Sequence, residues 1–211
     1  MSAGAALEPL RLIAITDFTS ISPEVTLERW QRLSRAARPG SVALDLRDRS
    51  LGARALLELG RALAAAARTA SQPLVVNDRL DLALLLGADG VHLGEGSVAT
   101  ADARRLLPLA FVVRACHAPE LAGAVDADAV LLSPIVEPRK GSPALGLAAL
   151  GAARRELARS GAGARLFALG GVDAARAGAC LEAGADGVAA IGAALGTAAS
   201  LELLGALGIR A

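Results

Sequence analysis

Short apolar runs alternate with longer amphipathic stretches along almost the whole of this 211-residue chain. The runs consist mainly of Leu, Val, Ile and Ala, which is typical of strands buried on both faces of a parallel sheet. Parallel neighbours need a crossover connection, usually a helix, so this alternation constrains the fold more than any other feature of the chain. Eight runs are predicted as strands: Leu10–Thr16, Ser41–Leu46, Pro73–Val76, Gly90–Leu93, Ala110–Arg114, Ala129–Leu132, Arg165–Leu169 and Gly187–Ile191.

The amphipathic stretches around these runs are predicted as helices. They are Pro23–Ala37, Gly52–Thr69, Arg79–Leu86, Thr100–Leu106, Pro119–Val125, Leu147–Arg159, Ala174–Ala183 and a last helix from about Ala199 to Leu207. Eight strand–helix units in this length favour a small closed barrel, and no Gly-x-Gly-x-x-Gly follows the first strand as a dinucleotide-binding open sheet would have. We therefore predict an α/β fold, a single (β/α)8 TIM barrel over residues 10–211, preceded by a flexible tail at residues 1–9.

The composition of the chain argues against several classes of binding partner. The formal net charge is +1, so no overall field favours nucleic acid or a membrane surface. No apolar run reaches the roughly 18 residues that a membrane-spanning helix needs, and the first residues lack the pattern of a signal peptide. Cys116 and Cys180 have no spacing typical of a metal site or a disulfide framework, so we expect reduced thiols in a cytoplasmic protein.

Two consecutive turns near the C-terminus predict a phosphate site. Gly170-Gly171 follows the seventh predicted strand, and Ala190-Ile191-Gly192 ends the eighth. Glycine lets backbone N–H groups approach a phosphate, and the N-terminus of the following helix favours negative charge. The loops after the last two strands of a (β/α)8 barrel are a frequent place for such a site.

Polar side chains gather where the predicted strands end. Chemistry in (β/α)8 barrels lies at this end, so the convergence of these residues on one mouth predicts the site. In chain order they are Asp17, Asp45, Arg47, Asp48, Arg49, Asn77, Asp78, His92, Glu95, Ser97, Arg114, Cys116, His117, Ser133, Glu137, Arg139 and Lys140.

Several of these residues also have an ordinary structural interpretation. Arg47 and Arg49 alternate along a strand end and face one side, where they form either a solvated rim or a site for phosphate oxygens. Asn77-Asp78 opens a helix, so it is either an N-cap or, at Asp78, an oxygen ligand of Mg²⁺. His117 either caps a helix or takes part in the chemistry, and Lys140 is either a solvated loop residue or part of the site.

Several of these motifs occur together in one known family. The matching segments, in order and at the right spacing, are Ile15-Thr16-Asp17, Leu46-Arg47-Asp48-Arg49, Val76-Asn77-Asp78-Arg79, Gly90-Val91-His92-Leu93-Gly94, Ser133-Pro134-Ile135 and Ala168-Leu169-Gly170-Gly171-Val172. On these motifs the chain resembles the thiamine phosphate synthase superfamily, which also contains a thiazole tautomerase branch. The likeness covers about residues 10–196.

The resemblance implies a transferase that joins hydroxymethylpyrimidine diphosphate to thiazole phosphate, giving thiamine phosphate and pyrophosphate. It implies that diphosphate leaves first and that the thiazole nitrogen captures the pyrimidinylmethyl cation, so neutralising charge on the leaving group is central. By this likeness Arg47, Arg49, Asn77 and Lys140 hold the diphosphate, Asp78 binds Mg²⁺, and Gly170, Gly171, Ala190 and Ile191 hold the thiazole phosphate through backbone N–H groups.

The chain departs from the family pattern in the metal and diphosphate half of the mouth. Asp45 stands where the family usually has Gln at the pyrimidine, Arg49 where it has Lys, and Ala115 where it has a serine that contacts the diphosphate. Ser97 stands where the family has a second Asp ligand of Mg²⁺, and a neutral serine cannot supply that charge. The Thr-rich loop that ends in Lys is here one residue shorter, Glu137-Pro138-Arg139-Lys140.

Three hypotheses follow from these departures. The first is a synthase with an altered metal site. The second is a thiazole tautomerase, which needs no Mg²⁺ and uses a histidine after the fifth strand, here His117, for proton transfer. The third is a non-catalytic barrel that binds a phosphate ligand. The resemblance is also compatible with a homodimer, although nothing in this sequence indicates an interface.

Overall fold

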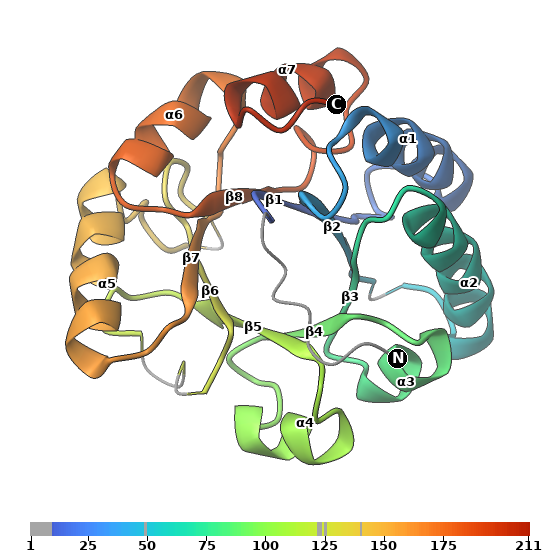
Figure 1. Ribbon diagram of the computed structural model, residues 1–211, viewed down its shortest axis with the longest axis horizontal. Helices are drawn as coiled ribbons and strands as arrows, with labels where there is room; N and C mark the ends of the chain where they lie inside the picture. The colour runs from blue at the N-terminus through green and yellow to red at the C-terminus, as the bar shows by residue number, and fades with distance from the viewer. Residues whose placement is uncertain (1–9, 49, 122–123, 125, 140) are drawn as a thin grey trace.

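The computed structural model describes residues 10–48, 50–121, 124, 126–139 and 141–211. Within these residues, eight parallel strands pair in chain order, and β8 pairs back with β1 to close a barrel (Figure 1). The strands are β1 (Leu12–Ile15), β2 (Val42–Leu46), β3 (Leu74–Asn77), β4 (Gly90–Leu93), β5 (Phe111–Cys116), β6 (Ala129–Leu132), β7 (Arg165–Ala168) and β8 (Gly187–Ala190). The predicted (β/α)8 barrel is therefore confirmed, while the predicted tail at residues 1–9 lies outside the described residues.

Helices surround the barrel (Figure 1). Those in the described part of the chain are α1 (Pro23–Ala36), α2 (Ala53–Thr69), α3 (Leu80–Leu86), α4 (Thr100–Leu106), α5 (Leu147–Ser160), α6 (Ala174–Glu182) and α7 (Ala198–Ala206). Each lies within one residue of its predicted bounds, because the apolar spacing that predicts them is also what packs them onto the strands.

One predicted helix, Pro119–Val125, is wrong for the residues that are described there. Pro119 and Glu120 form a turn, and Leu121 has a φ of +53°. A right-handed helix cannot continue through a residue in the left-handed region. Residues 122, 123 and 125 of this prediction lie outside the described part of the chain.

The core has an inner and an outer layer. Side chains such as Ile13, Val75 and Phe167 fill the barrel interior, and a larger cluster lies between the strands and the helices. Every position of β1 and β2 is buried, so β1 appears in the sequence as a continuous apolar run, and β2 is interrupted only by Asp45. In the outer layer the Trp30 indole N–H donates to the Leu63 carbonyl at 3.3 Å and joins α1 to α2.

Three aspartates tie neighbouring strands together at the amino-terminal end of the barrel. They directly precede β4, β6 and β8. The carboxylates of Asp89, Asp128 and Asp186 accept from the backbone N–H groups of Leu74, Val112 and Leu166 at 2.9, 2.7 and 2.7 Å. The backbone N–H of each aspartate donates in return to the carbonyl of the same partner. Each tie therefore satisfies backbone groups at the start of a strand and fixes its neighbour.

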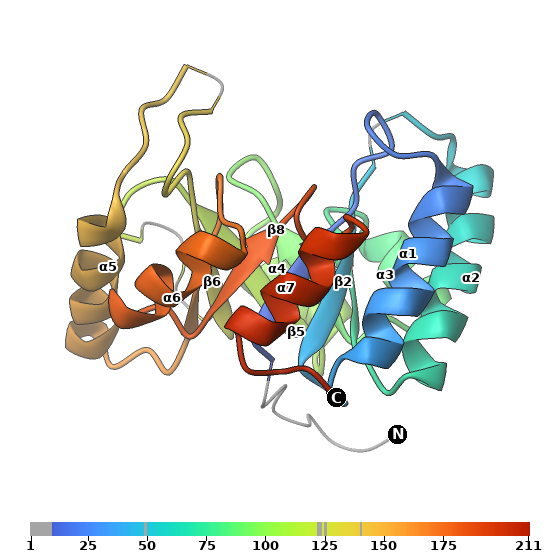
Figure 2. The ribbon, with the colours of Figure 1, turned by 90° about the horizontal axis from the view of Figure 1, so that it is seen from above.

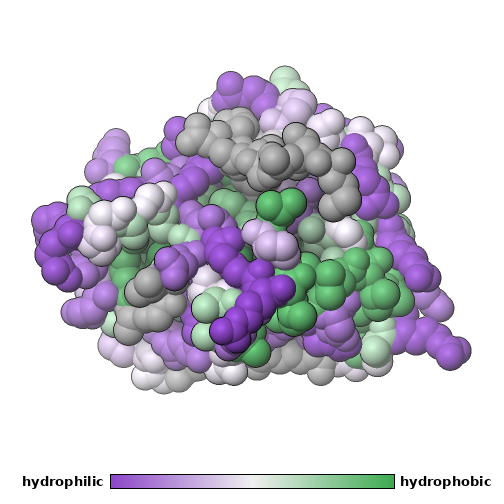
Figure 3. Space-filling view, turned by 60° about the horizontal axis from the view of Figure 1, so that its bottom comes forward, coloured by the Kyte–Doolittle hydropathy of each residue, from purple (hydrophilic) through white to green (hydrophobic). Residues whose placement is uncertain are grey.

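The carboxyl ends of the strands meet at the opposite end, where the segment between β6 and α5 rises above the other loops (Figure 2). On the side of the molecule that carries α3 and α4, apolar and polar surface lie next to one another (Figure 3). Leu84, Leu85, Leu106 and Leu109 of these helices and the turn after α4 are each more than half exposed. Among the described residues, no helix has the length and apolar character needed to cross a membrane.

Candidate functional site

Two cavities adjoin at the carboxyl ends of the barrel strands, each with a volume of about 390 Å³. The first is formed largely by the loops after β7 and β8, and the second by the ends of β1 to β6. Arg139, Leu169 and Ile191 line both cavities. A molecule in one cavity therefore lies next to a molecule in the other.

The first cavity is built on two glycines in a backbone conformation that other residues rarely adopt. Gly170 and Gly171 have φ values of +104° and +72°. A Cβ on Gly170 would also lie 2.9 Å from Pro134 Cα, so no side chain fits there. Ala190, the last residue of β8, and Ile191, which follows it, line the cavity, and α6 begins beside it behind its N-cap, Asp173. Two turns and a helix N-terminus meet here, as a phosphate site requires.

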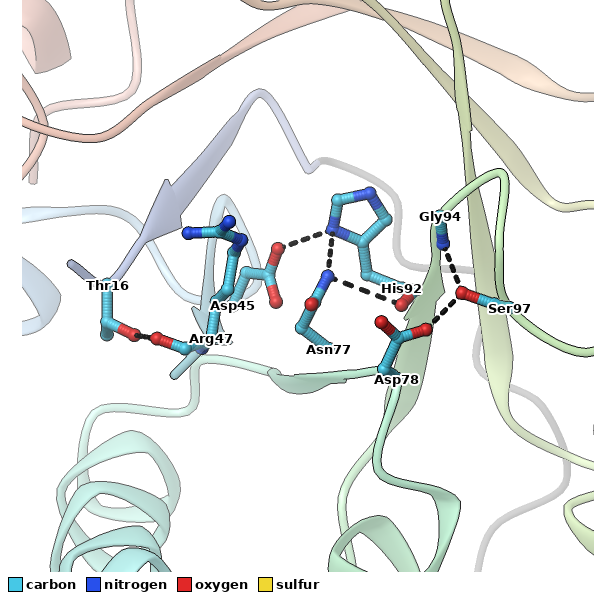
Figure 4. A network of polar contacts seen from close by, with 8 residues as sticks. All are labelled: Thr16, Asp45, Arg47, Asn77, Asp78, His92, Gly94 and Ser97. Carbon is cyan, nitrogen blue, oxygen red and sulfur yellow. Dashed lines mark hydrogen bonds and ion pairs between the residues drawn. The ribbon is translucent and has the colours of Figure 1, made fainter. Parts of the chain in front are cut away.

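The second cavity brings together most of the polar residues predicted at the mouth. Its lining consists of Ile15, Arg47, Asn77, Asp78, His92, Gly94, Glu95, Ala115, His117, Leu131, Ser133, Pro134, Arg139, Ser142, Leu169 and Ile191. The backbone of Arg47 is fixed to β1, because the Thr16 hydroxyl donates to its carbonyl at 2.7 Å and accepts from its N–H at 2.8 Å (Figure 4). This pair of bonds sets where the guanidinium leaves the end of β2.

Asp78 and Ser97 form a joined pair of oxygen donors at the rim of this cavity (Figure 4). Asp78 lies in the left-handed region with a φ of +61°, and its N–H donates to the His92 carbonyl at 3.0 Å. The Ser97 hydroxyl donates to Asp78 Oδ1 and accepts from the Gly94 N–H at 2.7 Å. The unusual turn at Asp78 is thus held in place by β4, and the two predicted metal ligands are brought together.

The donor chemistry of this pair fits Mg²⁺ when other oxygens complete the site. Asp78 Oδ2 accepts from no side chain or backbone group in the described part of the chain, and the Glu95 carboxylate lines the same cavity. Proteins usually bind Mg²⁺ through one or two carboxylates together with water and substrate phosphates. Among the described residues, no group of three His, Cys, Asp or Glu side chains could hold a metal, so the remaining ligands would have to come from elsewhere.

A buried pair, Asp45 and His92, lies at the floor of the second cavity (Figure 4). Asp45 Oδ2 lies 2.6 Å from His92 Nδ1, and the Asn77 amide nitrogen lies 3.1 Å from the same ring nitrogen. An ionised carboxylate can only accept, so an ionised Asp45 requires a hydrogen on Nδ1, and the Asn77 NH2 group then donates to the His92 carbonyl at 3.4 Å rather than to the ring. Asp45 Oδ1 and His92 Nε2 are buried and have no partner in the described part of the chain. Such atoms in a site indicate groups that a ligand satisfies.

The residues at the end of β5 have more ordinary surroundings. The exposed His117 lies with Nδ1 2.8 Å from the Ser133 carbonyl, which can only accept and therefore fixes a hydrogen on that nitrogen. Burial raises the pKa of the neighbouring Cys116 thiol to about 11, so it is a poor nucleophile at neutral pH.

Asp17, in the loop after β1, is engaged by residues of that same loop. Its carboxylate accepts from the Thr19 hydroxyl, and this hydrogen bond is the main cause of the lowered pKa of Asp17.

The structure thus brings most of the predicted site residues into two adjoining groups. Arg47, Asn77, Asp78, Ala115 and His117 line the second cavity, and Gly170, Gly171, Ala190 and Ile191 line the first. Asp45 lies behind His92, and Ser97 reaches the second cavity through Asp78. Arg49 and Lys140 lie outside the described residues.

One charged residue of the first cavity, Arg176, was not predicted from the sequence, and Glu137 was predicted at the mouth without a role. Arg176 lies in the first turn of α6, directly after the glycine turn. That position was the available signal, because a cation there is close to any phosphate that the turn binds.

The first cavity, built on glycine turns, suits a phosphate, and the second cavity beside it carries the oxygen donors of Asp78 and Ser97. A closed barrel with this pair of cavities is typical of (β/α)8 proteins that act on phosphorylated small molecules.

A family model described as thiamine monophosphate synthase matches residues 12–194. The chain is 39% identical over 168 residues to a thiamine-phosphate synthase of Methanoculleus marisnigri, covering 76% of this chain and 77% of the relative. It is 38% identical over 188 residues to one of Thermus thermophilus, covering 87% of each chain. A solved thiamine phosphate pyrophosphorylase from Pyrococcus furiosus has a TM-score of 0.79 and 25% identity, covering 97% of this chain and 98% of that one.

The chain belongs to the thiamine monophosphate synthase family. The predicted family and fold are both confirmed. The relatives just named are called synthases or a pyrophosphorylase, so these comparisons give no support to a thiazole tautomerase or to a non-catalytic barrel.

Proposed function

We propose that this protein is a Mg²⁺-dependent thiamine-phosphate synthase with an altered metal and diphosphate site. It breaks the bond between the pyrimidine methylene carbon and the diphosphate oxygen of hydroxymethylpyrimidine diphosphate. It forms a bond from that carbon to the ring nitrogen of thiazole phosphate, and the products are thiamine phosphate and pyrophosphate.

The shared wall between the two cavities carries this proposal. A reaction that joins two phosphorylated molecules needs two anion sites whose occupants touch, and Arg139, Leu169 and Ile191 line both cavities. Holding the reacting atoms next to each other removes much of the entropic barrier of a bimolecular step. The apolar Leu169 and Ile191 would exclude water from the cation that forms as diphosphate leaves.

The chain's own residues divide the work between binding and charge neutralisation. Gly170, Gly171 and the turn after β8 would hold the thiazole phosphate through backbone N–H groups. Arg47 and Asn77 would bind the diphosphate, joined by Arg49 and Lys140, and Arg47 would stabilise negative charge as it develops on the leaving oxygen.

The metal half of the site rests on Asp78 and Ser97. They would hold Mg²⁺ together with diphosphate oxygens and water, and Mg²⁺ supplies positive charge that favours departure of the diphosphate. Ser97 contributes a neutral hydroxyl, so the protein offers one negative ligand in this pair. We expect weaker binding of Mg²⁺ before the diphosphate arrives than a two-carboxylate site would show.

The test is to incubate the purified chain with both substrates and Mg²⁺ and to measure thiamine phosphate and pyrophosphate. We expect the two products in equal amounts. Arg47→Gln should lower kcat by about 10²–10³-fold, as loss of a group that stabilises transition-state charge does. Arg159→Gln is the matched control, since Arg159 lies in the last turn of α5 and pairs with Glu156 away from both cavities.

Two results would overturn the proposal. One is the absence of thiamine phosphate although both substrates bind. The other is product formation that Arg47→Gln leaves unchanged. Isomerisation of a thiazole carboxylate phosphate, lost in His117→Ala, would instead identify a tautomerase.

The proposal also includes the cellular location and the oligomeric state of the enzyme. We expect it in the cytoplasm as a homodimer, for which the exposed leucines of α3, Leu84 and Leu85, offer apolar surface. Light scattering coupled to size-exclusion chromatography measures the oligomeric state, and a monomeric mass at micromolar concentration would contradict the dimer.

A further inference from the structure

The first cavity contains a pair of charges that the proposed function leaves without a role. Arg176, in the first turn of α6, and Glu137, in the segment after β6, both line the cavity that contains Gly170 and Gly171. The Arg176 Nη1 atom lies 3.5 Å from Glu137 Oε1. This contact joins residues 39 positions apart across the glycine turn.

Arg176 is held at the edge of the cavity by one of its nitrogens. Nη1 also donates to the Gly171 carbonyl and to Asp173 Oδ2, at 3.1 Å in each case. Its Nε and Nη2 atoms donate to no group in the described part of the chain. The guanidinium is thus anchored next to the glycine turn and keeps donors that a phosphate could accept.

Glu137 lies directly on the glycine turn. A Cβ built on Gly171 would come within 2.7 Å of the Glu137 Cδ atom, and it would overlap Cγ still more closely. Gly171 therefore serves two purposes, because it adopts a φ of +72° and leaves room for the Glu137 side chain. The Glu137 side chain therefore covers the glycine turn from within the lining of the first cavity.

The charges of the first cavity cancel. Its lining contains two acidic residues, Glu137 and Asp173, and two basic ones, Arg139 and Arg176. A phosphate dianion entering this neutral set would meet a carboxylate on the turn itself, and like charges at short range repel. Moving Glu137 away from Arg176 would remove this repulsion, while the Gly171 carbonyl and Asp173 keep the guanidinium beside the turn.

We propose that Arg176 is a phosphate-binding residue of the first cavity and that Glu137 is an internal carboxylate that competes with phosphate for it. In the free protein Glu137 engages Arg176 above Gly171. A phosphorylated substrate displaces the carboxylate and takes over the Arg176 donors. This inference rests on the proposed function only in taking thiazole phosphate as the ligand of this cavity.

The test is calorimetric titration of thiazole phosphate into the full chain, without the second substrate. Glu137→Gln removes the competing charge and should tighten binding about 2- to 5-fold, the range of an exposed ion pair. Arg176→Gln should weaken binding about 10-fold or more, as loss of a charge-assisted hydrogen bond does. In the double variant the gain from Glu137→Gln should largely disappear, because Glu137 acts through Arg176.

Two controls separate this competition from a general structural effect. The thiazole alcohol, which lacks the phosphate, should show no dependence on either residue. Glu156→Gln and Arg159→Gln remove a Glu–Arg pair near the C-terminal end of α5 and should leave binding of thiazole phosphate unchanged. Inorganic phosphate, used as a competitor, should be a weaker inhibitor of binding in Arg176→Gln.

The outcomes are decisive for the inference and separable from the proposed function. Equal affinity for thiazole phosphate in the wild type and Arg176→Gln would overturn it, as would weaker binding in Glu137→Gln. An Arg176-dependent affinity in a protein that forms no thiamine phosphate would leave the inference standing and overturn only the synthase. A chain that binds neither thiazole phosphate nor inorganic phosphate would overturn the inference itself.

Discussion

We expect the buried Asp45–His92 pair to lower the free energy of unfolding of the barrel and to be retained because it contributes to the second cavity. Their contact is 2.6 Å long, and the His92 and Asp45 side chains are 8% and 0% exposed. A buried hydrogen bond to a charged group contributes about 1.5–3 kcal/mol. Asp45 Oδ1 and His92 Nε2, however, have no partner in the described part of the chain, and each such atom costs about 1–3 kcal/mol. The balance is a net cost of about 1–3 kcal/mol relative to apolar side chains.

The perturbation is the double variant Asp45→Val with His92→Met, which continues the apolar barrel interior formed by residues such as Val75 and Leu131. We expect the free energy of unfolding to rise by about 1–3 kcal/mol, which corresponds to roughly 2–12 °C in Tm for a chain of this size. Asp45→Val alone should instead lower it by about 1–3 kcal/mol, because His92 then loses its buried partner. Synthase activity should fall in both variants.

Urea unfolding followed by circular dichroism measures these differences, with the m-value checked for a constant change in exposed surface. A double variant less stable than the wild type would refute the reasoning, since the pair would then contribute to folding on balance. Full synthase activity in that variant would refute the link to the cavity.

Other predictions concern the metal ligands, the glycine turn and the buried thiol. Asp78→Asn should weaken Mg²⁺ binding about 10–100-fold, measured by titrating activity with Mg²⁺. Ser97→Asp should make Tm rise with Mg²⁺ more steeply than in the wild type, because a second carboxylate is then neutralised. Gly171→Ala should cost about 1–2 kcal/mol at its positive φ and weaken thiazole phosphate binding, whereas Gly178→Ala within α6 should do neither. The raised pKa of Cys116 means that its thiol ionises first in the unfolded chain, so stability should fall from about pH 9 to pH 11. The chain has no tyrosine, and Cys116→Ala should reduce this dependence, leaving the part due to Cys180, whose pKa burial also raises.

The sequence predicts the barrel well because strands that are buried on both faces are almost entirely apolar, and such runs are easily recognised in the sequence. Every residue of β1, for instance, is buried. The wrong helix at Pro119–Val125 has a cause that composition cannot reveal: Leu121 adopts a positive φ that leucine rarely takes. Backbone strain of this kind depends on the surrounding structure rather than on local propensity.

The site is predicted in outline for a simple reason, since polar residues at the carboxyl ends of parallel strands must meet at one mouth. Which of them touch depends on strand register. Asp45 meets His92 across 47 positions, and Asp78 meets Ser97 across 19. Arg176 was missed because its partner Glu137 comes from a long connection whose path the sequence pattern does not specify.

The aspartate ties at the amino-terminal end also bear on where the barrel can change. Asp89, Asp128 and Asp186 each join two consecutive strands, β3 to β4, β5 to β6 and β7 to β8. The remaining pair, β1 and β2, is joined at the same end by the Ser41 carbonyl, which accepts from the N–H groups before and at the start of β1. The Asp89 and Asp128 carbonyls also accept from the Phe111 and Arg165 N–H groups of β5 and β7, so the ties continue from one strand pair to the next. The base of the barrel is therefore held independently of the loops at the mouth, and this scaffold can acquire new chemistry through those loops without rebuilding its base.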